Sequence, residues 1–292
     1  MGQVGFIGLG DMGVPMASRL ARAGLSPLVW ARRAEPLETV VALGAVAVDS
    51  ADDVFRRSDH VILMLANAAA MDVVLGRGTP AFAGQVADTT VIHMGTTPPG
   101  YSVALEADIL AAGGRYAEVP VSGSTGPAET GDLVAMAAGD PDVLASIEDI
   151  VGHMCRATVP CGAVPKALQM KLAVNTYLGG LMEGLFEAFH FAATADLNLE
   201  TLAAVLEAGP MSCDVMRMKL PKLLSGDHSP QASIRQAVNN TVMITDEADR
   251  IGAHTPTLQV MRAVVEDASA QGMANEDVTA ITKTLAARAA QQ

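Results

Sequence analysis

The sequence predicts an α/β domain with a mostly parallel sheet, followed by an all-α domain, with one long helix between them. In the first half, short apolar runs alternate with helical patterns, which is typical of a parallel sheet covered by helices on both faces. After Gly162 only helical patterns remain. Between the halves, no strong breaker other than glycine interrupts the segment from Pro165 to about Thr194. We therefore predict two domains, 1–162 and 163–292.

Eight apolar segments are candidate strands. In chain order they are QVGFI, PLVW, AVAV, HVILML, TTVIHM, RYAEVPV, DLVAMAA and RATVPC. Helical patterns such as PLETVVAL, SADDVFRR and GYSVALEADILAAG lie between them. Ser50 has the residue type of an N-cap, and acidic residues follow it in the first turn.

The second half reads as helical throughout. A continuous helix of about 30 residues beginning near Pro165 would be about 45 Å long, at 1.5 Å per residue, and would join the two domains. Further helical patterns follow it, namely LETLAAVLEAG, CDVMRMKLPKLL, QASIRQAVNNTVMITDEADRIG, PTLQVMRAVVEDASAQG and NEDVTAITKTLAARAA.

Three glycines lie between the first predicted strand and the helix that follows it, in GFIGLGDMGVPMASRLARAG. Glycine is needed where a side chain would clash or where φ is positive. A helix N-terminus presents unpaired N–H groups and partial positive charge, which suit a pyrophosphate. G-x-G-x-x-G in this context is the fingerprint of a dinucleotide-binding Rossmann domain. The predicted cofactor contacts in this loop are Gly8, Leu9, Gly10, Asp11, Met12 and Gly13.

The residues after the second predicted strand indicate which dinucleotide binds. An acidic residue that bonds the ribose 2′-OH of NAD usually lies about 20 residues beyond the glycines. Here PLVW is followed by Ala31, Arg32 and Arg33, without a carboxylate. Arginine binds a 2′-phosphate through planar, charge-assisted hydrogen bonds. We predict NADP(H) contacts at these three residues; the alternative is that both arginines are solvated at a helix start.

Composition excludes several classes of protein. The chain has 292 residues, half of them hydrophobic, which is enough for two domains with a large core. Its net charge of −13 argues against nucleic acid as a partner, since phosphate binding needs basic patches. The three cysteines form no CxxC pair, so we predict no metal site, no disulfide framework and a reducing compartment.

No targeting or membrane segment is evident in the sequence. No run of about 18 apolar residues is long enough to span a membrane. The N-terminal segment has no basic leader and already carries the glycine motif. We therefore expect a cytoplasmic protein.

Together with the opening motif, three later segments resemble the β-hydroxyacid dehydrogenases, the family of 3-hydroxyisobutyrate dehydrogenase and the glyoxylate/succinic semialdehyde reductases. VPVSGSTGPAETGDL resembles the family's substrate-binding segment, KALQMKLAVN its catalytic helix, and MGTTPP part of its loop. The resemblance covers nearly the whole chain. It implies an NADP-dependent 3-hydroxyacid dehydrogenase or aldehyde reductase for a small carbonyl substrate. It also implies a 6-phosphogluconate dehydrogenase-like C-terminal domain that forms homodimers or homotetramers.

Lys171 and Asn175 are four residues apart, so they share one face of the predicted helix, among apolar neighbours. A lysine in a drier setting gives up its proton more readily. Reducing a carbonyl requires a proton at oxygen as hydride arrives from the nicotinamide. The resemblance implies that Lys171 is the general acid/base and that Asn175 holds the substrate and the lysine. The residues alone leave open a lysine whose ammonium lies in water.

The resemblance also implies the substrate contacts. It assigns Ser122 and Gly123 to the acid group of the substrate, in a glycine-rich loop whose N–H groups can hold a carboxylate. It places Thr96 near the nicotinamide and the substrate. At the end of the fourth strand, where open sheets bind ligands, we expect backbone contacts to the cofactor. These residues are Leu65, Ala66 and Asn67.

In the first domain the chain departs from the family pattern at three positions. Glu118 stands where the family has Asp, so a carboxylate is retained on a longer side chain. His93 and Gly95 replace an acid and a serine. The glycine is expected to enlarge the pocket. For His93 we favour a hydrogen-bonded structural residue over a proton carrier.

In the second domain the family's Lys-Asp pair is missing, and Asn239-Asn240 takes its place. A cation near the substrate and cofactor is therefore absent. Arg235, one helical turn before Asn239, is a candidate replacement, and we expect both residues at the substrate. The other interpretation is a roomier pocket that is less selective for a carboxylate.

Two alternative functions stay open. Imine reductases resemble this family in fold and cofactor but typically carry another residue at the position of Lys171. Gly95 and the missing Lys-Asp pair keep that alternative open. A non-catalytic dinucleotide-binding scaffold is the alternative of another class, and the retained Lys171 argues against it.

Overall fold

The computed structural model describes residues 2–289. The chain divides into two compact units, Met1–Lys171 and Leu172–Gln292, and each is described by itself. The division falls within α9 (Lys166–Thr194), whereas the predicted boundary lies at the end of β9 (Cys155–Gly162).

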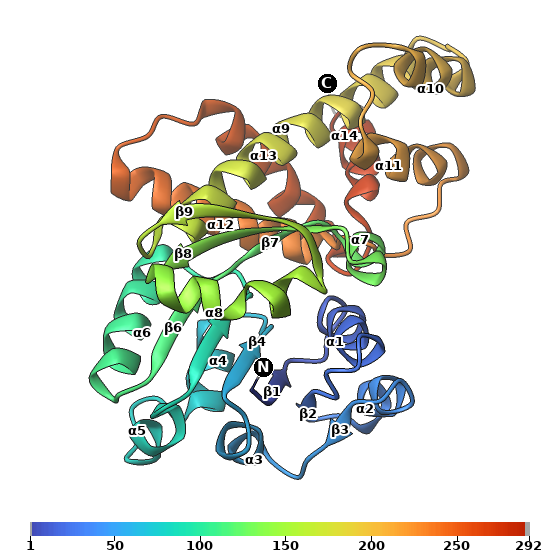
Figure 1. Cartoon of the computed structure of the whole chain (residues 1–292). Helices are drawn as coiled ribbons and strands as arrows, with labels where there is room; N and C mark the ends of the chain where they lie inside the picture. Colours follow the sequence, from blue (N-terminus) through green and yellow to red (C-terminus); the bar gives the residue numbers. More distant parts are fainter. Residues whose placement is uncertain (1, 290–292) are drawn as a thin grey trace. The chain divides into compact units, whose positions relative to one another are not determined.

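The first unit contains a nine-stranded, mostly parallel sheet (Figure 1). Six strands run parallel in the order β3-β2-β1-β4-β5-β6. This is the order of a doubly wound dinucleotide-binding domain, so the predicted fold class is confirmed. The six strands are β1 (Val4–Ile7), β2 (Leu28–Trp30), β3 (Val46–Ala47), β4 (His60–Leu63), β5 (Thr90–His93) and β6 (Arg115–Glu118).

Three further strands extend the sheet beyond β6. β8 (Leu133–Gly139) runs antiparallel to β6 and also pairs with β7 (Val121–Ser122) and with β9. The predicted strand RYAEVPV is divided into β6 and β7, with Pro120 between them. Proline lacks the N–H that a ladder needs, which explains the interruption.

The last residues of five parallel strands form a row across the sheet. Successive pairing partners in this row are Trp30, Ile7, Leu63, His93 and Glu118. The strand order reverses between β1 and β4. The crevice outside such strand ends, at the point of reversal, is where open α/β sheets bind ligands.

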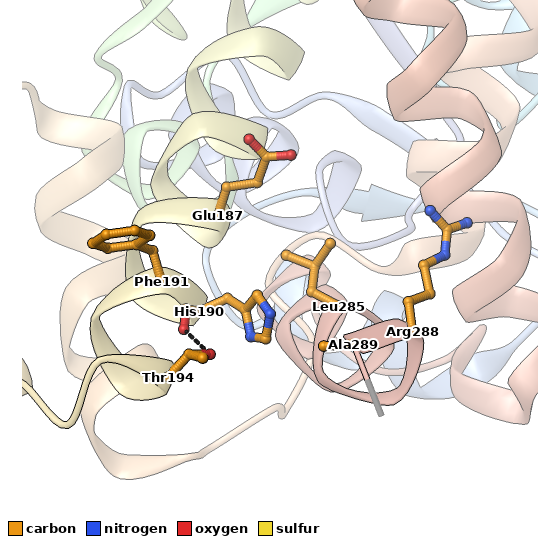
Figure 2. Close-up of a pocket in the computed structure, with 7 residues that line it drawn as sticks. All are labelled: Glu187, His190, Phe191, Thr194, Leu285, Arg288 and Ala289. Atoms are coloured by element: carbon orange, nitrogen blue, oxygen red, sulfur yellow. Dashed lines mark hydrogen bonds between the residues drawn. The ribbon is translucent and has the colours of Figure 1, made fainter. Parts of the chain in front are cut away.

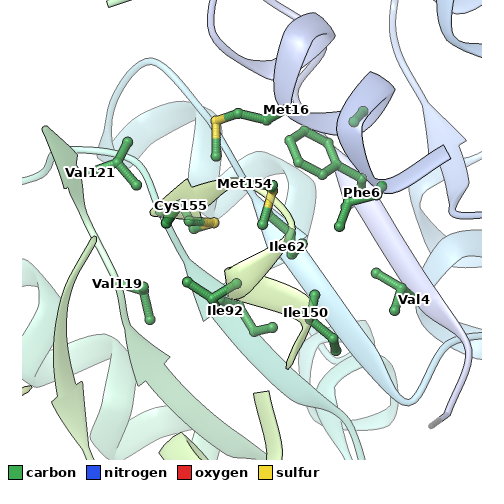
Figure 3. Close-up of a cluster of buried hydrophobic side chains, with 14 of the residues drawn as sticks. Val4, Phe6, Met16, Ile62, Ile92, Val119, Val121, Ile150, Met154 and Cys155 are labelled. Atoms are coloured by element: carbon green, nitrogen blue, oxygen red, sulfur yellow. The ribbon is translucent and has the colours of Figure 1, made fainter. Parts of the chain in front are cut away.

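Helices cover both faces of this sheet, and Figure 3 shows part of the apolar cluster on one face. There, Met16 of α1 and Ile150 of α8 pack against Phe6 and Ile62 of the strands. On the other face, the second cluster includes Leu105. The first face carries α1 (Gly13–Arg22), α2 (Ala34–Val41) and α8 (Pro141–Gly152). The second carries α3 (Ala51–Arg56), α4 (Ala68–Leu75), α5 (Ala81–Val86) and α6 (Pro99–Ala111).

Local signals explain where several helices begin. Ser50 caps α3, since its hydroxyl accepts the Asp53 N–H at 3.0 Å, as predicted. Asn67 caps α4 in the same way, by accepting the Ala70 N–H at 2.9 Å. We did not predict α4, α5, α8 or the short α7 (Thr125–Thr130).

The second unit is helical in every regular element that its described residues form, apart from one isolated bridge pairing Ser233 with Asp277. The predicted long helix is confirmed as the 29-residue α9. Lys219 and Asp277 form a buried ion pair at 2.8 Å. The remaining helices are α10 (Leu199–Ala208), α11 (Asp214–Ser225), α12 (Ile234–Ile251), α13 (Pro256–Ala268), a π-helical turn (Ser269–Met273), a 3-10 turn (Val278–Ala280) and α14 (Ile281–Ala289). Across residues 2–289, no helix combines the length and the apolarity needed to cross a membrane.

Candidate active site

The three glycines of the first loop have distinct roles. Gly8 has a φ of +107°, and a Cβ there would lie 2.2 Å from the Met64 carbonyl oxygen. A Cβ on Gly13 would lie 1.8 Å from the Gly8 carbonyl oxygen, so glycine allows α1 to pack against the strand. A Cβ on Gly10 would meet no atom within 4 Å. These are the turn, packing and ligand-approach roles of a dinucleotide-binding fingerprint.

The loop also offers hydrogen-bond donors to an anion. Among the described residues, the backbone N–H groups of Gly10, Asp11 and Met12 have no acceptor. They precede α1, whose N-terminus carries partial positive charge. The loop therefore fits the pyrophosphate of a dinucleotide.

Arg32 and Arg33 follow Trp30, the last residue of β2. The row of strand ends places them beside the Gly8 loop, because Trp30 pairs with Ile7. Both side chains are exposed, and neither forms an ion pair within the described part of the chain. Their charges are therefore available to a ligand phosphate.

The loops after β4 and β5 lie next to each other at the same edge, since Leu63 pairs with His93. A Cβ on Gly95 would lie 2.7 Å from the Leu65 carbonyl oxygen. The expectation that this glycine enlarges the pocket is therefore wrong, because its missing side chain faces the backbone of the neighbouring loop. The partly buried Thr96 follows it, and its hydroxyl has no protein partner within residues 2–289.

The predicted substrate loop begins at Ser122, the last residue of β7. Gly123 has a φ of +132°, and a Cβ there would lie 2.6 Å from Cδ2 of Leu133, so glycine is required. The Ser122 hydroxyl is partly buried and has no hydrogen-bond partner among the residues described. We expected a loop over this whole segment, but its second half forms the helix α7.

Lys171 lies in the second turn of α9 and is the last residue of the first unit. Its side chain is partly buried, and no described residue forms a hydrogen bond or an ion pair with the ammonium. Burial lowers the pKa of Lys171 to about 8. A lysine with this pKa can both donate and accept a proton near neutral pH.

Three other predicted residues belong to the second unit. Asn175 is buried and follows Lys171 by four residues in α9. Asn239 is exposed on α12. Arg235 donates to the Asn275 side-chain oxygen at 2.9 Å, so part of its guanidinium is already used.

Glu118 and His93, the other two departures in the first unit besides Gly95, are both fully buried. The Glu118 carboxylate accepts the backbone N–H of Leu168, in the first turn of α9, at 2.7 Å. Nδ1 of His93 lies 2.7 Å from the Tyr116 hydroxyl, and Nε2 has no partner in the described structure. Burial lowers the pKa of His93 to about 4, so the ring is neutral, as a structural histidine would be.

A cavity in the second unit lies elsewhere. It has a volume of about 430 Å³ and is lined from α9 and α14, with Glu187 and His190 on one side and Arg288 on the other (Figure 2). It contains none of the predicted site residues.

Comparison with known families agrees with this geometry. A family model described as the NAD binding domain of 6-phosphogluconate dehydrogenase matches residues 3–162. A second, described as the NAD-binding of NADP-dependent 3-hydroxyisobutyrate dehydrogenase, matches residues 166–285. The chain belongs to the β-hydroxyacid dehydrogenase family.

Named relatives of the chain are consistent with that assignment. Glyoxylate/succinic semialdehyde reductase 2 of Arabidopsis thaliana, a chloroplastic protein, is 27% identical over 285 residues, which cover 97% of this chain and 79% of the relative. The crystal structure of 3-hydroxyisobutyrate dehydrogenase from Salmonella typhimurium has a TM-score of 0.88 and 23% identity, over 97% of this chain and 99% of that one.

A solved structure described as Psf3 in complex with NADP+ and 2-OPP also shares the fold. It has a TM-score of 0.87 and 22% identity, with 97% of this chain and 99% of that chain covered. The family models and the named reductases and dehydrogenases support an oxidoreductase that uses a nicotinamide dinucleotide.

Sequence reasoning missed two buried residues, Tyr116 and Ser102. Tyr116 lies in β6 and Ser102 in α6, and their side chains hydrogen-bond each other at 2.7 Å. In the sequence, each of them is a polar group inside an otherwise apolar segment. This pattern does not identify the hydrogen-bond partner, because the partner lies on another element.

Proposed function

We propose that this protein is an NADP-dependent reductase of a small aldehyde or keto acid, and in reverse a 3-hydroxyacid dehydrogenase. The observation that carries the proposal is Lys171, a partly buried lysine that has no hydrogen-bond or ion-pair partner within residues 2–289 and a pKa lowered to about 8. The first turn of its helix donates the Leu168 N–H to Glu118, the last residue in the row of strand ends. We assign NADP binding to residues 1–162, and substrate binding and self-association to residues 163–292.

The bound dinucleotide would supply hydride to the carbonyl carbon, or accept it from the alcohol carbon. Lys171 donates a proton from Nζ to the carbonyl oxygen during reduction and takes one back during oxidation. The Ser122 hydroxyl and the Gly123 N–H hold the acid group of the substrate, and Thr96 orients it. The further proposed substrate contacts are Asn175, Arg235 and Asn239.

The pKa of Lys171 predicts opposite pH profiles for the two directions. Carbonyl reduction requires the ammonium form, so kcat/KM is expected to fall as pH rises through about 8. Alcohol oxidation requires the neutral amine, so its kcat/KM is expected to rise over the same range. Initial rates in both directions, read from NADPH absorbance, test this. Two profiles that move in the same direction would contradict the acid/base role.

Arg32→Ala is expected to weaken NADP binding about tenfold or more, because a charge-assisted hydrogen bond to the 2′-phosphate contributes about 1.5–3 kcal/mol. NAD binding should change little, since NAD lacks that phosphate. Titration of both dinucleotides against the variant measures the difference. Arg22→Ala, an exposed arginine in the last turn of α1, is the matched control. Equal losses for NADP and NAD would refute the assignment.

A second candidate function, imine reduction, is favoured by Asn239-Asn240 in place of a lysine and an acid. The retained Lys171 favours carbonyl reduction. NADPH oxidation measured with succinic semialdehyde and with a cyclic imine separates the two. Binding of NADPH without turnover on a broad carbonyl and imine panel would instead support a non-catalytic scaffold.

We also propose that the chain forms a homodimer or homotetramer. Tyr177 and Phe191 of α9 expose 74% and 71% of their surfaces, more than large aromatic side chains usually do on a monomer. Light scattering after size exclusion should give a mass of two or four chains. A monomer at micromolar concentration would contradict this proposal.

A further inference from the structure

Four buried polar side chains join the end of β5 to the start of α9, all within the first unit. Nδ1 of His93 lies 2.7 Å from the Tyr116 hydroxyl, and that hydroxyl lies 2.7 Å from Oγ of Ser102. Ser102 in turn hydrogen-bonds Oε2 of Glu118. Each of the four side chains is at most 2% exposed. A buried polar group left without its hydrogen bond costs free energy. Each of these side chains therefore constrains the orientation of the next.

We propose that Glu118 is a positioning residue for Lys171, and that Ser102, Tyr116 and His93 hold Glu118 in place through one directional chain of hydrogen bonds. The inference rests on the proposed role of Lys171 in proton transfer.

Glu118 supplies the cap that α9 lacks locally. Pro165 precedes the helix and has no side-chain oxygen to accept an N–H. The N–H of Lys166 is bonded to the Ala163 carbonyl. The N–H of Leu168 goes to Glu118, 50 residues earlier in the chain. Burial raises the pKa of Glu118, and hydrogen bonds from Ser102 and from the N–H groups of Leu168 and Ala167 oppose that rise by stabilising the carboxylate.

This cap controls the turn that carries the catalytic amine. Lys171 follows Leu168 by three residues, so it lies about one helical turn beyond the capped N–H. A shift of the first turn moves the lysine with it. A displacement of about 1 Å at a reacting group can cost on the order of a hundredfold in rate.

The chain has a direction when Glu118 is ionised. A carboxylate only accepts, so Ser102 must donate to it. The Tyr116 hydroxyl then donates to Ser102, and Nδ1–H of the neutral His93 donates to Tyr116. Nε2 of His93 is left with a lone pair, and it is the ring nitrogen without a partner in the described structure.

A change at Glu118 should therefore be detected at His93, at the other end. In Glu118→Gln, the amide oxygen must still accept the Leu168 N–H, so the amide NH2 faces Ser102. Ser102 then donates to Tyr116, and Tyr116 donates to Nδ1. The proton of the imidazole is expected to move to Nε2.

Nitrogen-15 NMR of the histidine rings at pH 8 tests this directly, with His93 assigned by comparison with His93→Asn. We expect an Nδ1–H ring in the wild type and an Nε2–H ring in Glu118→Gln. Glu106→Gln is the matched control. It loses a partly buried carboxylate on α6 that makes no hydrogen bond to α9 among the described residues, so it should leave the tautomer unchanged. The same tautomer in the wild type and in Glu118→Gln would overturn the directional chain.

A double-mutant cycle tests positioning. Glu118→Gln is expected to lower kcat about tenfold or more, with dinucleotide affinity unchanged. In a Lys171→Ala background the same change should lower residual turnover less than twofold, because the group that it positions is gone. Equal losses in both backgrounds would show a general structural role and overturn the inference.

The two proposals fail in different ways. If Lys171→Ala alone keeps full turnover, the proposed function fails. The tautomer experiment still tests the chain of hydrogen bonds from Glu118 to His93. If Glu118→Gln does not fold, Tyr116→Phe replaces it in the cycle, since it removes one hydroxyl and keeps the ring. A folded Tyr116→Phe with unchanged kcat would then overturn the inference.

Discussion

Replacing Lys171 by alanine is expected to reduce carbonyl-reduction turnover about a hundredfold or more, which is the scale of a general acid/base. The amine is partly buried, its pKa is lowered to about 8, and no described residue competes for its proton. Dinucleotide affinity should stay within about twofold, since the glycine loop and Arg32 lie on other elements. Steady-state kinetics with NADPH and a dinucleotide titration measure both quantities.

Lys166→Ala is the matched control for this variant. Lys166 lies five residues earlier in α9, is exposed, and donates to the Gln169 side chain at 3.0 Å. Its removal should leave turnover within about twofold, as surface substitutions usually have small effects. Unchanged turnover in Lys171→Ala, or equal losses in both variants, would remove Lys171 from the mechanism.

Gly13→Ala is expected to lose stability, whereas Gly10→Ala is expected to keep its stability and to lose dinucleotide affinity. At Gly13 the new Cβ would lie 1.8 Å from a backbone oxygen, so the free energy of unfolding should fall by about 2–3 kcal/mol or more. At Gly10 the Cβ meets no protein atom within 4 Å, so stability should change by less than about 0.5 kcal/mol. Dinucleotide affinity of Gly10→Ala should nevertheless fall about tenfold or more, because the methyl occupies the side that the pyrophosphate approaches.

Urea unfolding and dinucleotide titration separate the two effects. Trp30, the single tryptophan of the sequence, ends β2 directly before Ala31 and Arg32, so its fluorescence can report binding. Arg22→Ala again serves as the control. A Gly10→Ala protein that binds NADP as tightly as the wild type would show that the loop does not hold the pyrophosphate.

The sequence predicted the elements with strong local signals. Apolar runs identified the parallel strands, and the glycine spacing identified the loop between β1 and α1. The long α9 was predictable because no strong breaker interrupts it. α4 was missed because AAAMDVVL is apolar nearly all round and lacks an amphipathic pattern. α7 was missed because glycine and proline within TGPAET indicate a loop.

At the site, residue types were predictable, but contacts between distant elements were not. Lys171, Ser122 and Gly123 follow from motifs. Tyr116 and Ser102 could not be predicted, because their pairing depends on how α6 packs on β6. Gly95 was misinterpreted for the same reason: its environment is set by the Leu65 carbonyl on the neighbouring loop. A local sequence pattern does not show which backbone segment of another element lies opposite a residue.

The contact between Gly95 and Leu65 also matters for enzyme engineering. Any larger residue at position 95 collides with main chain, which cannot rotate away as a side chain can. Libraries intended to change substrate range should therefore leave this position as glycine and diversify the proposed substrate contacts Thr96 and Ser122 instead. Installing serine at position 95 would require a simultaneous redesign of the loop after β4.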